Sequence, residues 1–491
     1  MAQLAFFWVS FARPFARFCG HMPAGSDPIP RAHAPLAQGF VWTALAAALS
    51  AGFGAAALLA LLLGFELPLA DWWLPLVQVH GFAQAFGWLG LFIMGVSLYF
   101  VPRFSGTPLR WPALQQAIWV LTGAAMLGRL TGQLWLSGEP GNGAGAGVLG
   151  LAGLAGGLAV LCYLLLLASA LRRAPRHQAI TQVKPFLLTA LCGWLLAGAL
   201  GTGAALRAAL RGEALLEAPW HRLSLDLFAA LVLLPVAFAF SLRTFPLYLR
   251  LAPARWPVRP FALFYLAACA LDFLPPLLWP GATGLTVQGL GKALKGGALL
   301  VFVWNLDLLL RRKLPWTAEQ ELPSQPRRFH PPTRPGMPDY GEFGHFERLL
   351  QAAYLCLALA GLLELWNGIA ALRGTDPPWV PDALRHLYLA GFGTLLLLGM
   401  APRMIPGFVG RRRVAHPWLV DLSGGLGLAA ALSRVAPVAL APFLPEAYPA
   451  LATWSSYLFG VSGGLGWLAV ACLALNLGAT LAAPRAGEKA A

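Results

Sequence analysis

Residues 80–106 read HGFAQAFGWLGLFIMGVSLYFVPRFSG, and this stretch decides the fold. Between His80 and Val101 the chain carries no charged side chain. The run is long enough to cross the hydrocarbon core of a bilayer, which takes about 20 residues of α-helix. A histidine marks one end of the run, and an arginine beside a proline marks the other. We therefore predict a membrane-spanning helix with a distinct polar residue at each end.

The whole chain has the composition of a protein embedded in lipid. Of its 491 residues, 58% are hydrophobic and 11% are charged, with a mean hydropathy of +0.66, whereas a soluble domain carries about 25% charged residues. An open sheet would leave backbone groups unpaired in hydrocarbon, so long apolar runs must be helices. The predicted fold class is an all-α, polytopic membrane protein in contact with the lipid bilayer.

Apolar stretches of spanning length recur along the chain. Twelve helices are predicted, at about 38–64, 80–101, 113–136, 146–171, 184–207, 222–249, 259–280, 284–310, 347–372, 385–408, 418–440 and 450–480. Most Lys and Arg residues fall in the loops on one side, which the positive-inside rule assigns to the cytoplasm. The formal charge of +15 is explained in this way, and no nucleic-acid partner is expected.

The polar segments set the predicted organisation. The linker at 311–346 mixes proline with charge and has no helical periodicity. The predicted parts are a cytoplasmic N-terminal tail (1–37), transmembrane helices 1 to 8 (38–310), a cytoplasmic linker loop (311–346), transmembrane helices 9 to 12 (347–482) and a cytoplasmic tail (483–491).

Three of the nine histidines repeat at a regular position. His80, His221 and His386 stand at the outside ends of helices 2, 6 and 10, four helices apart. The cytoplasmic ends of the same helices carry related arginine-containing exits, VPRFSG, SLRTFP and APRMIPGFVG. We interpret the chain as three related four-helix units.

Histidines at matched depth on separate helices suit a haem. Neutral imidazole is a common axial ligand of haem iron, and two imidazoles on opposite sides give a six-coordinate haem that transfers electrons or senses. The alternative is that each histidine is an interfacial residue that hydrogen-bonds to headgroups or water. The chain has six cysteines but no CxxCH motif for covalent attachment, so the expected haem is of the non-covalent b type.

A family resemblance rests on two of these helices. Residues 80–106 resemble the second helix of haem-copper oxidase subunit one, whose HG opening supplies a ligand of the low-spin haem. HLYLAGFGTLLLLGMAPRMIPGFVG, residues 386–410, resembles the tenth helix of that family from its second histidine onward. The twelve helices, three histidines and arginine-proline exits resemble more closely the NnrS family of haem- and copper-containing membrane proteins, which is linked to nitric oxide response.

The departures from the oxidase pattern limit what the resemblance implies. The oxidases carry a ligand of the oxygen-binding haem where this chain has Leu384. Residues 259–280 contain no histidine pair, and His221 lacks the GHPEVY-like context of a copper ligand. The resemblance thus implies haem ligation by His80 and His386. Copper follows from the NnrS resemblance alone, with His221 as the candidate ligand, and no oxygen-reducing turnover is expected.

Three cations lie inside predicted spans. Lys292 and Lys295 are three residues apart in helix 8, and Arg129 lies in helix 3. Each costs about 2.5–3.5 kcal/mol at mid-membrane on insertion scales, so each should face protein or water. The lysines are expected to point into the bundle toward a haem propionate, an acid such as Glu364 or Asp272, or a polar path from the cytoplasm. Arg129 is expected near a propionate. Snorkelling or structural pairing is the alternative for all three.

The expected function is that of an NnrS-type haem protein of a bacterial cytoplasmic (inner) membrane, acting in nitric oxide response or detoxification. The haem should lie near the outer face, without proton pumping, with nitric oxide as a ligand and an unidentified electron donor as a partner. An oxidoreductase of the nitric oxide reductase or haem-copper oxidase class is the first alternative. A secondary transporter is the second, although transporters commonly have two repeated halves. The sequence leaves open whether the protein is an enzyme.

Overall fold

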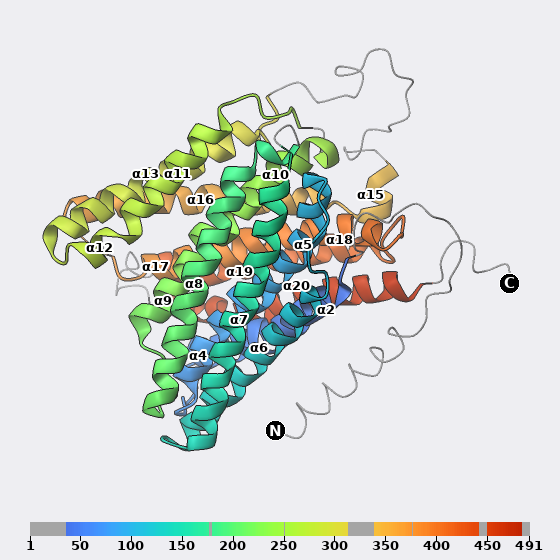
Figure 1. The fold of residues 1–491 in the computed structure, drawn as a ribbon. Coiled ribbons are helices and arrows are strands. Elements are labelled where there is room, and N and C mark those ends of the chain that lie inside the picture. The colour runs from blue at the N-terminus through green and yellow to red at the C-terminus, as the bar shows by residue number, and fades with distance from the viewer. Residues whose placement is uncertain are drawn as a thin grey trace, which may run out of the picture.

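The computed structural model describes residues 36–175, 179–249, 251–312, 338–375, 377–440 and 449–483. All regular elements within these residues are helices (Figure 1). The predicted tails, apart from a few residues next to the helices, and most of the predicted linker lie outside the described residues. The end of that linker contains a short helix, α15 (Pro338–Phe343), where no helix was predicted.

The helices begin and end within a few residues of the apolar stretches. The first half of the chain forms α2 (Gln38–Ala47), η1 (Ala48–Gly52), α3 (Phe53–Gly64), α4 (Trp73–Phe82), η2 (Ala83–Gly90), α5 (Leu91–Ser105), α6 (Leu114–Gly138), α7 (Gly143–Arg173), η3 (Ala179–Thr181), α8 (Lys184–Arg211), α9 (Ala218–Leu227), η4 (Phe228–Leu233) and α10 (Leu234–Leu249). The second half forms α11 (Val258–Phe273), α12 (Pro275–Leu278), α13 (Ala282–Leu306), α15, α16 (Phe346–Leu372), α17 (Val380–His386), η5 (Leu387–Thr394), α18 (Leu395–Phe408), α19 (Pro417–Leu440) and α20 (Pro449–Ala482).

Ten helices of the described residues are long and apolar enough to cross a membrane. Two more, α6 and α13, have 25 residues each but carry Arg129 or the two lysines. The predicted total of twelve spans requires that both also cross, and it stays a prediction. A polytopic membrane fold is clear from the ten helices alone.

The three histidine-bearing helices form the centre of the bundle. In their most apolar windows, 72% of residues are buried in Trp73–Ser105, 78% in Ala218–Leu249 and 83% in Val380–Phe408, against 33–44% in the other seven spans. The remaining helices surround them, and α20 packs along α3, so the last span lies beside the first (Figure 1). The centre is therefore protein-facing on all sides, and the outer helices face lipid.

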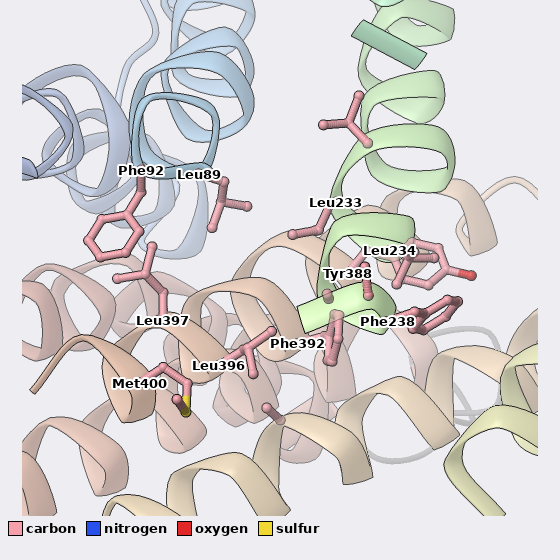
Figure 2. Packing of buried hydrophobic residues seen from close by; sticks show 14 of the residues in the cluster. Leu89, Phe92, Leu233, Leu234, Phe238, Tyr388, Phe392, Leu396, Leu397 and Met400 are labelled. Atoms are coloured by element: carbon pink, nitrogen blue, oxygen red, sulfur yellow. The ribbon is translucent and has the colours of Figure 1, made fainter. Parts of the chain in front are cut away.

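Each central helix widens into a π-helical segment just after its histidine. These segments are η2, η4 and η5, and they contact one another. At their meeting point a Cβ on Gly393 would lie 3.0 Å from a Leu89 methyl and 3.1 Å from a Leu233 methyl, so a larger residue would require these side chains to shift. Figure 2 shows Leu89 and Leu233 directed toward each other from their helices. π-Helical segments occur frequently at functional sites.

Backbone groups in the widened segments have side-chain partners. Tyr265 donates a hydrogen bond to the carbonyl of Ala230 in η4 at 2.6 Å. Trp467 donates one at 2.9 Å to the carbonyl of Leu49 in η1, a π-helical segment of the first span. Trp88 Nε1 donates to Thr394 Oγ1 at 3.1 Å and joins η2 to η5. Since no water is present in hydrocarbon to satisfy such groups, these bonds allow irregular backbone at the core of the bundle.

Small residues allow the outer helices to approach closely. A Cβ on Gly296 of α13 would lie 2.5 Å from the backbone nitrogen of Leu365 and 2.6 Å from the carbonyl oxygen of Gly361, both in α16. A Cβ on the neighbouring Gly297 would meet nothing within 4 Å. Close backbone packing of this kind is a main source of helix association in membranes.

We predict that Gly296→Ala separates α13 from α16 and destabilises the protein by about 1–3 kcal/mol, the usual range for overpacking. The thermal unfolding midpoint of the protein in detergent should fall. Gly297→Ala is the matched control, since it adds the same methyl to the same helix and should leave the midpoint unchanged or raise it. Equal midpoints for the two variants would contradict the close contact.

Candidate functional site

Polar side chains, some buried and some half-buried, gather in three clusters at the central helices. We call them the histidine site (His80, His386, Asp382 and Arg434), the arginine site (Arg129, His221, Gln133 and Gln78) and the lysine site (Lys295, Asp272, Glu364 and Tyr388). Each cluster contains a cation, and each combines a central helix with outer helices.

The histidine site holds two imidazoles in the same state. His80 Nδ1 lies 2.9 Å from the carbonyl oxygen of Gly52, and His386 Nδ1 lies 2.8 Å from that of Asp382. A carbonyl can only accept a hydrogen bond, so in both rings Nδ1 carries the hydrogen and the lone pair is on Nε2. Histidines that bind a metal through Nε2 usually donate the hydrogen of Nδ1 to such a carbonyl, which fixes the orientation of the ring. The two histidines come from α4 and α17, whose following segments η2 and η5 are in contact.

Arg434 brings a cation to the histidine site from α19. Its Nη2 lies 2.8 Å from Asp382 Oδ2, and its guanidinium lies 4.6 Å from the centre of the Phe459 ring. Its Nη1 is buried and has no hydrogen-bond partner in the described part of the chain. Asp382 precedes His386 by one helical turn and its Oδ1 is 3.5 Å from His386 Nδ1. A buried, unsatisfied guanidinium nitrogen is costly, which makes Arg434 a candidate contact for an anionic ligand.

The arginine site lies on another side of α4. Arg129 Nη2 is 3.2 Å from His221 Nδ1, Arg129 Nε donates to Gln133 Oε1 at 3.1 Å, and the guanidinium lies 4.1 Å from the centre of the Phe82 ring. A guanidinium has only donors, so His221 Nδ1 accepts and the imidazole hydrogen is on Nε2. Neither nitrogen of His221 then offers a lone pair to a metal. This geometry does not favour His221 as a copper ligand.

A copper ion would also need a donor set in the described part of the chain. Within the described residues, no three His, Cys, Asp or Glu side chains are grouped so that they could hold a metal ion. The residues present in that part of the chain therefore do not fit a protein-ligated copper centre.

The lysine site is a closed ion network. Lys295 Nζ lies 2.5 Å from Asp272 Oδ2 and 2.8 Å from Glu364 Oε1, and the Tyr388 hydroxyl donates to Glu364 Oε1 at 3.0 Å. The three charged side chains are only 4–6% exposed. The prediction that Lys295 points inward to an acid is confirmed. Lys292 is half-buried, and no carboxylate pairs with it among the described residues.

The histidine and lysine sites lie on opposite faces of one helix. Tyr388 follows His386 by two residues, and successive residues of an α-helix are rotated by about 100°, so the two side chains point roughly opposite ways. Phe82, which packs on Arg129, likewise follows His80 by two residues. The structure therefore places His80 and His386 on two neighbouring central helices, and it places Arg129 and Lys295 in the other two clusters.

Sequence reasoning missed Arg434 and Asp382 as parts of a site. A signal existed for each of them. Arg434 is a lone cation in the apolar stretch 418–440, and Asp382 precedes a candidate ligand by four residues, which places it on the same helical face. The ion pair of Arg385 with Asp226, at 2.7 and 3.0 Å, was also missed. It joins α17 to α9 beside the histidine site.

The fold matches a solved membrane enzyme. The structure of a haem-copper terminal oxidase dimer aligns with a TM-score of 0.64 over 91% of this chain and 83% of that chain, at 14% sequence identity. No family model and no curated protein matches the sequence. At this identity the likeness concerns the fold alone. The prediction of an all-helical, haem-copper-oxidase-like membrane fold is confirmed.

We predict that Lys295→Met destabilises the protein by about 3–5 kcal/mol, because loss of one partner leaves buried carboxylates without a counter-charge. The expected result is a large fall in the thermal unfolding midpoint in detergent. Adding Asp272→Asn and Glu364→Gln should restore part of the loss.

Lys292→Met is the matched control, since it removes a lysine from the same helix without breaking an ion pair, and it should change the midpoint little. If Lys295→Met melted with the wild type, the ion network would not contribute to stability.

Proposed function

We propose that this membrane protein binds a b-type haem at the histidine site, with His80 and His386 as the two axial ligands. The observation that carries the proposal is the shared hydrogen-bonding state of the two rings. Both Nδ1 atoms are bound to backbone carbonyls, at 2.9 and 2.8 Å, which leaves both Nε2 lone pairs for iron. The rings come from α4 and α17, two helices of the buried centre, so the ligands are held on a rigid scaffold.

Arg434 is the residue best suited to meet a haem propionate. Its Nη1 is buried without a partner, and it already lies beside Asp382 and hence beside His386. Arg129 and Lys295 are engaged in the other two clusters, and Lys292 lies on α13 with Lys295. We therefore assign the propionate role to Arg434 rather than to those three cations.

His80 and His386 would hold a haem iron through their Nε2 atoms. The bound haem supplies one-electron redox chemistry, and such coordination suits electron transfer or sensing. The protein's own groups orient the rings. The carbonyls of Gly52 and Asp382 accept hydrogen bonds from Nδ1 of His80 and His386. The ion pair of Arg385 with Asp226 joins α17 to α9. These bonds hold the ligands at a fixed separation and allow little reorganisation when the charge of the site changes.

We further propose the biological role of the NnrS family, nitric oxide response or detoxification at a bacterial inner membrane. The support is the threefold histidine repeat within an oxidase-like fold. Both termini are proposed to be cytoplasmic, so the histidine site lies toward the outer face. Electrons would come from a separate donor. Copper is left out of the proposal, because the described residues do not fit it.

An oxidase-type or nitric oxide reductase-type reaction finds no specific support. It would need a second metal beside a haem with an open position. The interior between η4 and η5 is filled by Leu233, Leu234, Phe238 and Phe392 (Figure 2), which belong to one continuous apolar core. A transporter role is likewise not favoured by any observation, since the centre has three related helices rather than two halves.

We predict that His80→Ala or His386→Ala abolishes the low-spin, six-coordinate haem spectrum of the purified protein, because each removes one axial ligand. His221→Ala is the control. It removes a histidine at the same depth on the third central helix and should keep the spectrum. Optical spectra with haem content by pyridine extraction measure both effects. Unchanged spectra in both ligand variants would leave these histidines as interfacial residues.

The nitric oxide role has its own test. A bacterial strain that lacks the gene should grow more slowly than its parent under a nitric oxide-releasing compound. A plasmid copy of the wild-type gene should restore growth, and the His386→Ala copy should not, although both proteins reach the membrane in equal amounts by immunoblot. Full restoration by His386→Ala would separate the haem ligand from nitric oxide response.

A further inference from the structure

A groove runs along the membrane-facing side of α7, at the end of the helix where the loop between α5 and α6 reaches it. The groove has a volume of about 390 Å³, within the range of sites that bind small molecules. Its floor is apolar and consists of Leu161, Leu164, Leu165 and Ala168. Leu161 and Leu165 are 50% and 57% exposed. Because α7 is a span of the bundle, these side chains meet lipid.

Three arginines surround the polar end of the groove. Arg172 and Arg173 belong to the last turn of α7, and Arg110 belongs to the loop. Among the described residues, no carboxylate lines the groove. The sequence has no Asp or Glu within residues 101–115 or 160–185, the segments that form the groove and its surroundings along the chain. These segments therefore bring positive charge to the groove without a counter-charge of their own.

Arg173 fixes the loop against the helix. Its Nη2 donates a hydrogen bond to the carbonyl of Pro108 at 2.8 Å, and its Nε donates one to the carbonyl of Ser169 at 3.0 Å. Pro108 precedes Arg110 by two residues, so the bond keeps Arg110 and Trp111 at the groove. The Arg110 guanidinium lies 4.7 Å from the centre of the Trp111 ring, which orients it further. Arg173 is thus part of the framework of the groove.

Arg110 and Arg172 are the two guanidinium groups that a ligand can reach. Both are exposed, and neither forms a hydrogen bond or an ion pair with another residue in the described part of the chain. Guanidinium donors match the oxygens of a phosphate in geometry and charge. A lone exposed arginine would be an ordinary anchor at the membrane surface. Here two arginines share a groove with an apolar floor, so the complementary ligand is an anion joined to a hydrocarbon chain.

The spacing of these residues along α7 matches one leaflet of a bilayer. Leu161, Leu165, Ala168 and Arg172 follow one another at intervals of three or four residues, so they share one face of the helix. From Leu161 to Arg172 the helix rises about 16 Å, and half of the hydrocarbon core of a bilayer measures about 15 Å. Trp111 stands beside the arginines, and tryptophan is enriched where membranes meet water. A lipid with its phosphate at Arg172 therefore places its chain along the leucines.

We propose that this groove binds an anionic phospholipid, with its phosphate between Arg110 and Arg172 and one acyl chain along Leu161 and Leu165. Basic pockets at the ends of transmembrane helices are suited to anionic lipid head groups. The rest of the lipid stays in the surrounding bilayer, so the groove holds only the phosphate and part of one chain. The proposal does not rest on haem at the histidine site, because no residue of the groove belongs to that site.

The test is native mass spectrometry of the purified full-length protein in detergent, which measures how tightly added phosphatidylglycerol binds. The double variant Arg110→Gln with Arg172→Gln should raise the dissociation constant of the first bound lipid by about tenfold or more, since two charge-assisted contacts are lost. The double variant Arg110→Lys with Arg172→Lys keeps both charges and should retain most of the affinity.

Arg255→Gln with Arg259→Gln is the matched control. Both arginines are exposed, at the start of α11 and in the loop before it, and neither lines the groove. The two glutamine double variants lose the same charge, so only the groove variant should lose the tightly bound lipid. Phosphatidylcholine, whose head group has no net charge, and glycerol 3-phosphate, which has no acyl chain, should compete poorly. Unchanged thermal unfolding midpoints in detergent would show that both variants fold.

Equal affinity of the wild type and the groove variant for phosphatidylglycerol would overturn the proposal. Equal competition by phosphatidylcholine would show that the charge is not recognised, and equal competition by glycerol 3-phosphate would assign the groove to a free phosphate; either result would also overturn it. The same spectra report the oligomeric state. A dimer that is lost only in the groove variant, with lipid binding unchanged, would assign this face to a second copy of the chain instead.

Discussion

The contact of three helices at their π-helical segments is the constraint on which the rest of the structure depends. Leu89, Leu233 and Gly393 meet there, and the missing side chain of Gly393 leaves room for the two leucines. Because every backbone group in a bilayer interior needs an internal partner, widening a helix at this depth is tolerated only where protein surrounds it. The high burial of these three spans meets that condition.

That packing also separates the polar groups into three clusters. Side chains two positions apart on a helix point to roughly opposite sides, so His386 and Tyr388 belong to different sites, as do His80 and Phe82 with its arginine. The three cations differ in how many carboxylates pair with them. Lys295 is neutralised by two carboxylates, Arg434 by one, and Arg129 by none in the described part of the chain. The number of paired carboxylates therefore separates the ion network of Lys295, which is structural, from Arg434 and Arg129, which can still pair with an anion.

The fold is shared with a haem-copper oxidase, but the chemistry must be argued from the residues at the sites. Apolar and aromatic side chains pack the interior between η4 and η5, and the ion network of Lys295 lies beside them. Such packing leaves little room for a second metal centre there. The same three-helix centre holds both imidazoles of the histidine site in a fixed orientation.

Much of the fold could be predicted from the sequence. Apolar runs of spanning length determine helices in lipid whatever their neighbours, because backbone groups have no other partner there. The repeat of His80, His221 and His386 likewise indicated three related helices. The inward direction of Lys295 followed from the cost of a charge in hydrocarbon.

The sites depended on tertiary structure. Position along a helix places a histidine at a depth, but which ring nitrogen is free depends on a partner from elsewhere. The carbonyl of Gly52 in the first span accepts from His80, and Arg129 of α6 donates to His221. The sequence alone gave Arg129, Lys292 and Lys295 the same alternatives, a haem propionate or a structural partner, although their surroundings differ. Only the rotation of each helix about its own axis, which is set by packing against its neighbours, decided which of them share a site.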